Sequence, residues 1–364
     1  MMRGESPCPS QVDALRGAGK LALLACALML NACATAPVTD YTVDVPAGVT
    51  DGRARFTETF CSVLNERGDS LPDNRPCADA LSHVAGSPPG TGRPVELSPS
   101  QRHLVAAMVP GIGYACIAAW LQPPDTAREH LAKFGYELQT VDVDALSGSA
   151  RNAGQVRDAV MALPQDPGPP SVVLFGYSKG APDILEAVVR YPELQQRVVA
   201  VVSIAGAVGG SPLADDAHQG QANMMVHWPK AQCDPGDGGA VESLRTDVRR
   251  KWLADNRLPP GIRYYSVVTL PDRDRISSII TPTYRKLAKI DPRNDSQMIY
   301  SDQIIPGSTL VGFLNADHWA VAVPIDRAHG VIGSTFVNHN DYPREALLES
   351  LLRYVEEDVG AAGR

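Results

Sequence analysis

One pentapeptide combines a hydroxyl side chain with two glycines at a point where the chain is expected to turn. Residues 176–180, GYSKG, follow the apolar run 172–175 and precede a helical pattern over 181–191. On a tight strand-to-helix turn the glycines remove side chains that would clash. The hydroxyl is then held at a helix N-terminus, where backbone N–H groups can stabilise a developing negative charge. This context predicts that Ser178 is a nucleophile, although the pentapeptide alone is a weak signal.

The elements that must position Ser178 alternate along the chain. Several short runs are apolar on both faces, as buried parallel strands require; they lie at 104–109, 136–143, 172–175, 198–204, 263–268 and 310–314. Helical patterns separate them, at 115–134, 151–163, 181–191 and 343–356. Strands that alternate with helices predict βαβ crossovers and a parallel sheet covered on both faces.

Three short motifs resemble the α/β-hydrolase superfamily near its bacterial lipase and esterase branch. They are VPGIG at 109–113, GYSKG at 176–180 and NDSQMIYS at 294–301. The resemblance covers roughly residues 101–356 and implies an α/β-hydrolase fold, with a mostly parallel sheet. In that fold the chain order is nucleophile, acid, then histidine. The resemblance therefore implies His318 as the base of Ser178, because His318 lies in the loop that leaves the last predicted strand.

The acid that would orient His318 has several candidates. Segment 294–301 resembles the acid loop of bacterial lipases, and on that resemblance we prefer Asp295. Asp302 is the second choice and Asp272 the third. Asp317 is adjacent to the histidine and would point the wrong way. A turn or cap role would explain the remaining aspartates.

The turn at 109–113 resembles the VHGIG turn of small Bacillus-type lipases, with Pro110 in place of the histidine. The resemblance implies that the backbone N–H groups of Ile112 and Lys179 form an oxyanion hole. The lysine also suggests a Ser-Lys dyad. Neighbours on a sharp turn diverge, however, so we do not expect the Lys179 side chain to act as the base.

The N-terminal residues are typical of an export signal. A sparse basic region precedes the ten-residue apolar run 21–30, which is too short to span a bilayer, since a spanning helix needs about 20 residues. Leu-Asn-Ala-Cys33 resembles the bacterial lipobox, which implies a lipid anchor on Cys33 and a place in the cell envelope. Ala34 after the cysteine implies the outer membrane, facing the periplasm. An ordinary signal peptide is the alternative.

Beyond Cys33, four cysteines permit two disulfides in an oxidising compartment. Cys61 and Cys77 flank a turn-like segment, so we predict that they pair and that Cys116 pairs with Cys233. Four buried free thiols are the alternative.

Charge and motif content exclude several classes of function. The formal net charge is −8, and Lys and Arg form no run, which argues against binding to nucleic acid or to anionic headgroups. The sequence contains no CxxC or HExxH, and no Cys/His cluster has zinc spacing, so neither a metal nor a cofactor is predicted.

The predicted organisation has four parts. Residues 1–32 form a lipoprotein signal peptide, 33–50 a tether, 51–98 an N-terminal extension, and 99–364 the α/β-hydrolase domain. Within that domain, residues about 206–260 form an insertion that is longer than a strand-to-helix loop needs; we expect a lid or binding cap there, or a packing excursion.

These features together predict a serine hydrolase of carboxylic esters, including lipid esters. Two rivals remain open. One is an envelope acyltransferase or amidase that uses the same acyl-enzyme, and the other is a non-catalytic envelope binding protein on the hydrolase fold.

Overall fold

The computed structural model describes residues 41–362, apart from 122–124, 165–170 and 218–235. The predicted signal peptide, Cys33 and Cys233 lie outside the described residues. Among the described residues, no helix is long and apolar enough to cross a membrane.

A seven-stranded sheet forms the centre of the fold, and every strand pairing in it is parallel. The strand order is β1-β7-β6-β5-β4-β2-β3. The strands are β1 (Thr50–Asp51), β2 (Val105–Val109), β3 (Glu137–Thr140), β4 (Val172–Tyr177), β5 (Val198–Ile204), β6 (Arg263–Thr269) and β7 (Thr309–Leu314). Six of them coincide with the predicted apolar runs, and the predicted α/β-hydrolase fold class is confirmed.

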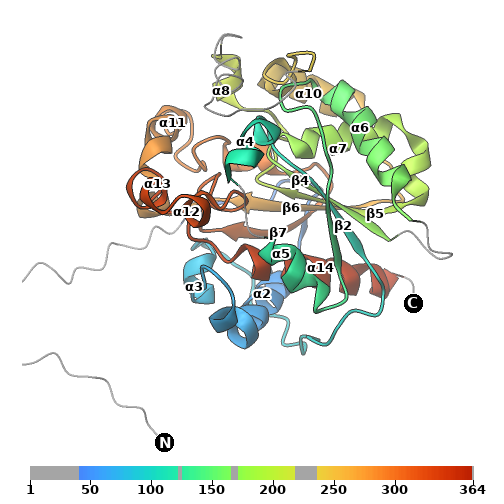
Figure 1. The fold of residues 1–364 in the computed structure, drawn as a ribbon, viewed down its shortest axis with the longest axis vertical. Helices are drawn as coiled ribbons and strands as arrows, with labels where there is room; N and C mark the ends of the chain where they lie inside the picture. Colours follow the sequence, from blue (N-terminus) through green and yellow to red (C-terminus); the bar gives the residue numbers. More distant parts are fainter. Residues whose placement is uncertain (1–40, 122–124, 165–170, 218–235, 363–364) are drawn as a thin grey trace, which may run out of the picture. The chain divides into compact units, whose positions relative to one another are not determined.

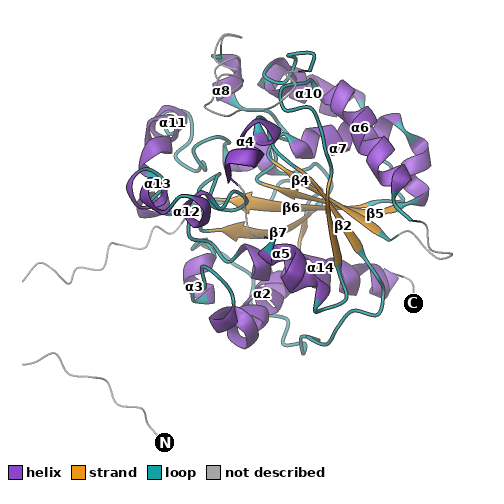
Figure 2. Cartoon of the chain, in the orientation of Figure 1, coloured by secondary structure: helices purple, strands orange, loops and turns teal. Residues whose placement is uncertain are grey.

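Helices cover both faces of the sheet (Figures 1 and 2). One layer contains α6 (Ser149–Ala162), α7 (Gly180–Arg190) and α10 (Thr246–Asp255). The other contains α2 (Arg53–Arg67), α5 (Thr126–Ala132) and α14 (Arg344–Ala362). Side chains of β4 alternate between the two layers: Leu174 packs with the first and Phe175 with the second, and both are fully buried. This alternation is why the strand reads as a continuous apolar run.

Shorter helices extend the loops between these elements. They are α3 (Cys77–Ala80), α4 (Tyr114–Leu121), α8 (Pro212–Asp215), α11 (Thr281–Leu287), α12 (Ile325–Ala328) and α13 (Gly330–Thr335). Of the predicted insertion, residues 206–217 and 236–260 are described, and they contain α8 and α10.

The N-terminal extension packs on the domain through α2. Its apolar face is buried, with Phe56 and Phe60 stacked at 5.6 Å between ring centroids. Cys61 and Cys77 form the predicted disulfide. Cys116 is buried, and its predicted partner lies outside the described residues.

The predicted tether is too long at its C-terminal end. Tyr41 forms a bridge with Val84, and Thr50 pairs with Thr309 at the edge of the sheet. Residues 41–45 alternate apolar and polar side chains, and Val43 and Val45 pack on the cluster that contains Phe313. Residues 41–50 therefore belong to the folded domain because they bury this apolar face.

Candidate active site

Ser178 lies on the turn between β4 and α7, with the positive φ of 53° that a sharp strand-to-helix turn imposes. The flanking glycines are required by close backbone approaches. A Cβ on Gly176 would lie 2.6 Å from the Cα of Ala181, and a Cβ on Gly180 would overlap the carbonyl oxygen of Val109. A non-glycine residue at φ 53° is unfavourable, so the surrounding packing holds the serine in a conformation that places its hydroxyl at the strand end.

The structure brings Ser178, His318 and Asp295 together. The Nε2 atom of His318 lies 2.9 Å from Oγ of Ser178, and its Nδ1 atom lies 2.8 Å from Oδ2 of Asp295. His318 follows β7, and Asp295 lies between β6 and β7. Both residues lie at the carboxyl ends of the strands, as Ser178 does. All three residues are buried, and Asp295 is fully buried. The imidazole can therefore exchange a proton with the hydroxyl while its other nitrogen is held by the carboxylate.

Four groups hold the Asp295 carboxylate. Its Oδ1 accepts the backbone N–H groups of Gln297 at 2.9 Å and Met298 at 2.7 Å. Its Oδ2 accepts the Thr269 hydroxyl at 2.5 Å as well as the ring of His318. The backbone N–H of His318 also donates to the Asp295 carbonyl, at 3.0 Å. These bonds fix the direction in which the carboxylate points.

The other acids considered from the sequence have different partners. Asp302 lies 3.9 Å from the Arg250 guanidinium, and burial raises the pKa of its carboxyl to about 6. Asp272 accepts a hydrogen bond from the side chain of Asn315 at 2.8 Å. The Asp317 carboxylate accepts backbone N–H groups from its own loop and from residue 277, so it turns away from the neighbouring imidazole.

The loop at residues 110–113 lies against the serine. A Cβ on Gly111 would come 3.0 Å from Cβ of Ser178, so only a glycine lets the backbone approach this closely. No hydrogen bond within the described part of the chain uses the amide of Ile112 or that of Lys179. Two backbone donors near the hydroxyl are thus available to a ligand.

The Lys179 side chain does not reach toward the serine hydroxyl. Its ammonium lies 2.7 and 2.8 Å from the two carboxylate oxygens of Asp183, one turn along α7. Asn152 donates to the same carboxylate at 2.8 Å. This buried ion pair agrees with the expectation that the lysine is not the base.

Three further side chains support this arrangement, and sequence reasoning gave none of them a role. Thr269 ends β6, and Gln303 accepts the Thr269 backbone N–H at 2.8 Å while donating to its carbonyl at 3.1 Å. The hydroxyl of Tyr177 donates to the carbonyl of His318 at 2.8 Å. Their only signal in the sequence is position: Thr269 and Tyr177 stand at the carboxyl ends of strands, where a parallel sheet places its site.

Comparison with known proteins places this architecture in a family. No family model matches the chain, and no curated protein matches it. Among solved structures, a metagenomic carboxyl esterase is 39% identical, with 93% of this chain and 100% of that chain covered and a TM-score of 0.80.

Two more distant structures share the fold. The mature lipase BlEst2 of Bacillus licheniformis is 20% identical, with 67% of this chain and 95% of that chain covered and a TM-score of 0.50. The Staphylococcus hyicus lipase is 14% identical, with 72% of this chain and 99% of that chain covered and a TM-score of 0.50. On the full-length match at 39% identity, the chain belongs to the α/β-hydrolase family, among its serine carboxyl esterases and lipases.

Proposed function

We propose that this protein hydrolyses carboxylic esters through an acyl-enzyme on Ser178, with His318 as general base and Asp295 as the orienting acid. The observation that carries the proposal is the continuous contact from Oγ through the imidazole to the carboxylate, at 2.9 and 2.8 Å. A serine hydroxyl of ordinary pKa requires such a base to attack a carbonyl carbon.

The reaction proceeds in two halves. Nε2 of His318 takes the hydroxyl proton as Oγ of Ser178 bonds to the ester carbon, and the amides of Ile112 and Lys179 bind the oxygen that becomes negative. The tetrahedral intermediate collapses, the ester C–O bond breaks, and the imidazolium gives its proton to the leaving alcohol. Water then attacks the acyl-enzyme by the same route and releases the carboxylic acid.

Asp295 holds the imidazole in the required tautomer. Its carboxylate accepts the Nδ1 proton, which leaves Nε2 free to accept the proton of the serine. The negative charge also stabilises the imidazolium that forms in each half of the reaction. Because four groups hold the carboxylate, the ring keeps its direction through the cycle.

The substrate class is a small-molecule or lipid ester. The 39% identical relative is described as a carboxyl esterase, which supports ester cleavage here. A chain-length series of nitrophenyl esters, from acetate to palmitate, measures the acyl preference. Product analysis with competing alcohols and amines separates hydrolysis from acyl transfer, because a transferase would yield the new ester or amide.

Labelling with a fluorophosphonate tests the nucleophile directly. We expect the folded wild-type protein to be labelled at Ser178 and the Ser178→Ala variant to remain unlabelled. Heat-unfolded protein is the control, because an ordinary serine does not react. A folded wild-type protein that takes no label would contradict the proposal and favour a binding protein without turnover.

We also propose that Cys33 carries a lipid anchor that holds the enzyme at the outer membrane, facing the periplasm. The Leu-Asn-Ala-Cys sequence supports it, and residues 33–40 remain as the tether. Wild-type protein should incorporate radiolabelled palmitate and partition with membranes, whereas Cys33→Ser should be unlabelled and soluble with unchanged esterase activity. Palmitate label that persists in Cys33→Ser, or a wholly soluble wild-type protein, would overturn the anchor and leave the hydrolase proposal intact.

A further inference from the structure

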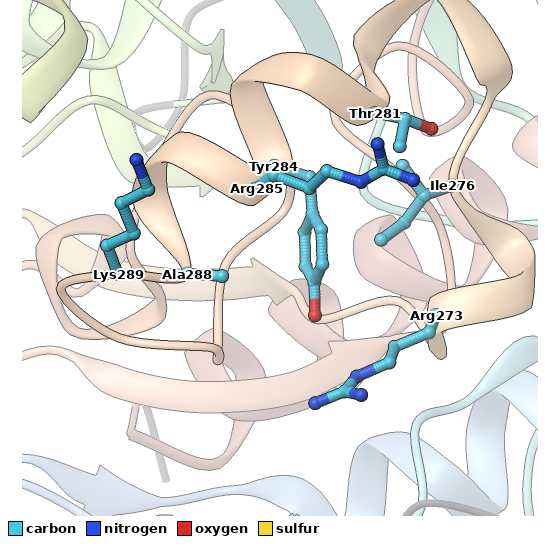
Figure 3. A pocket seen from close by; sticks show the side chains of 7 residues that line it. All are labelled: Arg273, Ile276, Thr281, Tyr284, Arg285, Ala288 and Lys289. Atoms are coloured by element: carbon cyan, nitrogen blue, oxygen red, sulfur yellow. The ribbon is translucent and has the colours of Figure 1, made fainter.

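A pocket of about 440 Å³ lies at the hydrophobic cluster against which Trp319, the neighbour of His318, packs. It is lined by Arg273, Ile276, Thr281, Tyr284, Arg285, Ala288 and Lys289 (Figure 3). These residues come from the segment after β6 and from α11 and the turn that follows it. None of the three residues of the proposed triad lines the pocket.

Three exposed cations form the rim of this pocket. Arg273, Arg285 and Lys289 take part in no ion pair among the described residues, and no acidic side chain lines the pocket. Lys286, on the same helix, differs: its ammonium lies 3.0 Å from the Asp216 carboxylate. Like charges gathered around one cavity repel each other, and an anion bound between them would offset that repulsion.

This concentration of positive charge is not a consequence of composition. The chain has a formal net charge of −8, and its basic residues form no run. From the sequence we expected no attraction to anionic groups. The pocket is a local exception, because the short stretch 273–289 between β6 and the turn after α11 places Arg273, Arg285 and Lys289 around one cavity.

The floor of the pocket is apolar. Ile276 and Tyr284 are buried and pack in one cluster with Ile280, Ala288 and Trp319, the neighbour of His318. Figure 3 shows the hydroxyl end of Tyr284 directed toward Arg273, and the Arg285 side chain extending toward Ile276. The pocket thus presents an apolar surface framed by donors that fit phosphate and carboxylate oxygens.

We propose that this pocket binds the anionic group, a phosphate or carboxylate, of an amphipathic ligand whose apolar part contacts Ile276 and the Tyr284 ring. This anionic group belongs either to a soluble amphiphile or to the headgroup of a membrane lipid. Ile279 is 46% exposed and lies in sequence between two lining residues, so an apolar surface adjoins the cationic rim. The two sources share one recognition chemistry, and the experiment distinguishes them.

Calorimetric titration of the full-length protein with decyl phosphate, below its micellar concentration, tests the proposal. The double variant Arg285→Gln, Lys289→Gln should bind at least about tenfold more weakly, because two charge-assisted contacts are lost. Lys286→Gln is the matched control on the same helix and should stay within about twofold of wild type, because its charge faces Asp216. Binding should also weaken with added salt.

Decanol should bind much more weakly than decyl phosphate, since it lacks the charge. Equal affinity for the two compounds, an unchanged affinity in the double variant, or an equal loss in Lys286→Gln would overturn the proposal. Fluorophosphonate labelling of the double variant should match wild type. A failure at this pocket is thereby distinguished from a failure at Ser178.

Vesicles identify the source of the anion. Binding to phosphatidylglycerol vesicles but not to phosphatidylcholine vesicles, lost in the double variant, would support a lipid headgroup. Binding of decyl phosphate without binding to either vesicle would support a soluble amphiphile. Failure to bind decyl phosphate and phosphatidylglycerol vesicles alike would overturn the site.

Discussion

Two buried histidines in this protein each contact a buried carboxylate, yet only one of them faces a nucleophile. His318 lies 2.8 Å from Asp295, and His130, on α5, lies 2.7 Å from Glu349, on α14. Both pairs are almost excluded from solvent. A short contact between imidazole and carboxylate is therefore not enough to identify a catalytic pair.

The surroundings of the two carboxylates differ. Glu349 is also 2.7 Å from the Arg353 guanidinium and 3.1 Å from that of Arg67. Burial alone would raise the pKa of the Glu349 carboxyl, but hydrogen bonds from His130 and Arg353 outweigh burial and hold that pKa below its usual range. The pair joins helices on one face of the sheet, and the ring of His130 packs 5.1 Å from that of Phe134. Its role is structural.

At His318 the partners are arranged for proton transfer. One ring nitrogen is held by Asp295, and the other faces the hydroxyl of Ser178 at the carboxyl ends of the strands. No guanidinium shares the Asp295 carboxylate among the hydrogen bonds and ion pairs of the described residues. The catalytic pair is thus distinguished from the structural pair by its position at the carboxyl ends of the strands and by the second ring nitrogen, which faces a nucleophile.

The largest expected effect is the loss of activity when Ser178 or His318 is replaced. Ser178→Ala and His318→Ala should each lower ester hydrolysis by at least about 10⁴-fold. Ser178→Ala should change the melting temperature little, because it removes only a hydroxyl. Steady-state kinetics and thermal unfolding provide the measurement. Activity within tenfold of wild type in either variant would remove that residue from the mechanism.

Asp295→Asn should cost about 10³- to 10⁴-fold in kcat, since the amide can stabilise the wrong imidazole tautomer. Asp302→Asn is the control and should retain activity within about threefold. The reverse ranking would reassign the acid to Asp302.

Asp302→Asn should also change how the stability of the protein depends on pH. Burial raises the pKa of Asp302 to about 6, above its usual 3.8, so the folded state favours the protonated carboxyl. Wild-type stability should therefore fall as the pH rises from 4 to 6, whereas Asp302→Asn should not show this loss. The variant should be more stable at pH 8, by up to about 3 kcal/mol, with no difference near pH 4. A less stable variant at pH 8 would contradict this account.

Glu349→Gln should lower the stability but not the turnover, which is the opposite of the effect expected for Asp295→Asn. It leaves two buried guanidinium groups without their shared carboxylate, so we expect a loss of about 3–5 kcal/mol in the free energy of unfolding. Turnover at 20 °C, where the variant is still folded, should stay within about threefold of wild type. A large loss of kcat with unchanged stability would mean that the two pairs are not distinct in role.

The smallest effect concerns the support of Asp295. Thr269→Val removes the hydroxyl donor at 2.5 Å with little change in shape and should lower kcat by about tenfold. Thr269→Ser should restore most of the activity because it restores the donor. If Val and Ser behave alike, Thr269 only fills space and does not position the carboxylate.

The sequence by itself predicted those features that local pattern determines. Strands such as β4 and β5 appear as apolar runs because both of their faces are buried. The turn at Ser178 depends on glycines that lie within two residues of it. The Cys61–Cys77 disulfide was likewise predicted from residues close together in the sequence.

Only the tertiary structure decided which distant groups meet. Asp295, Asp302 and Asp272 carry the same side chain. Only Asp295 contacts His318, because the turn at 294–299 directs its carboxylate toward the carboxyl ends of the strands. The alternation of apolar and polar side chains at 41–45 is too short to define a strand, and the two-residue edge strand β1 is defined by its pairing with β7. Such contacts depend on how the elements pack, and no spacing along the chain encodes them.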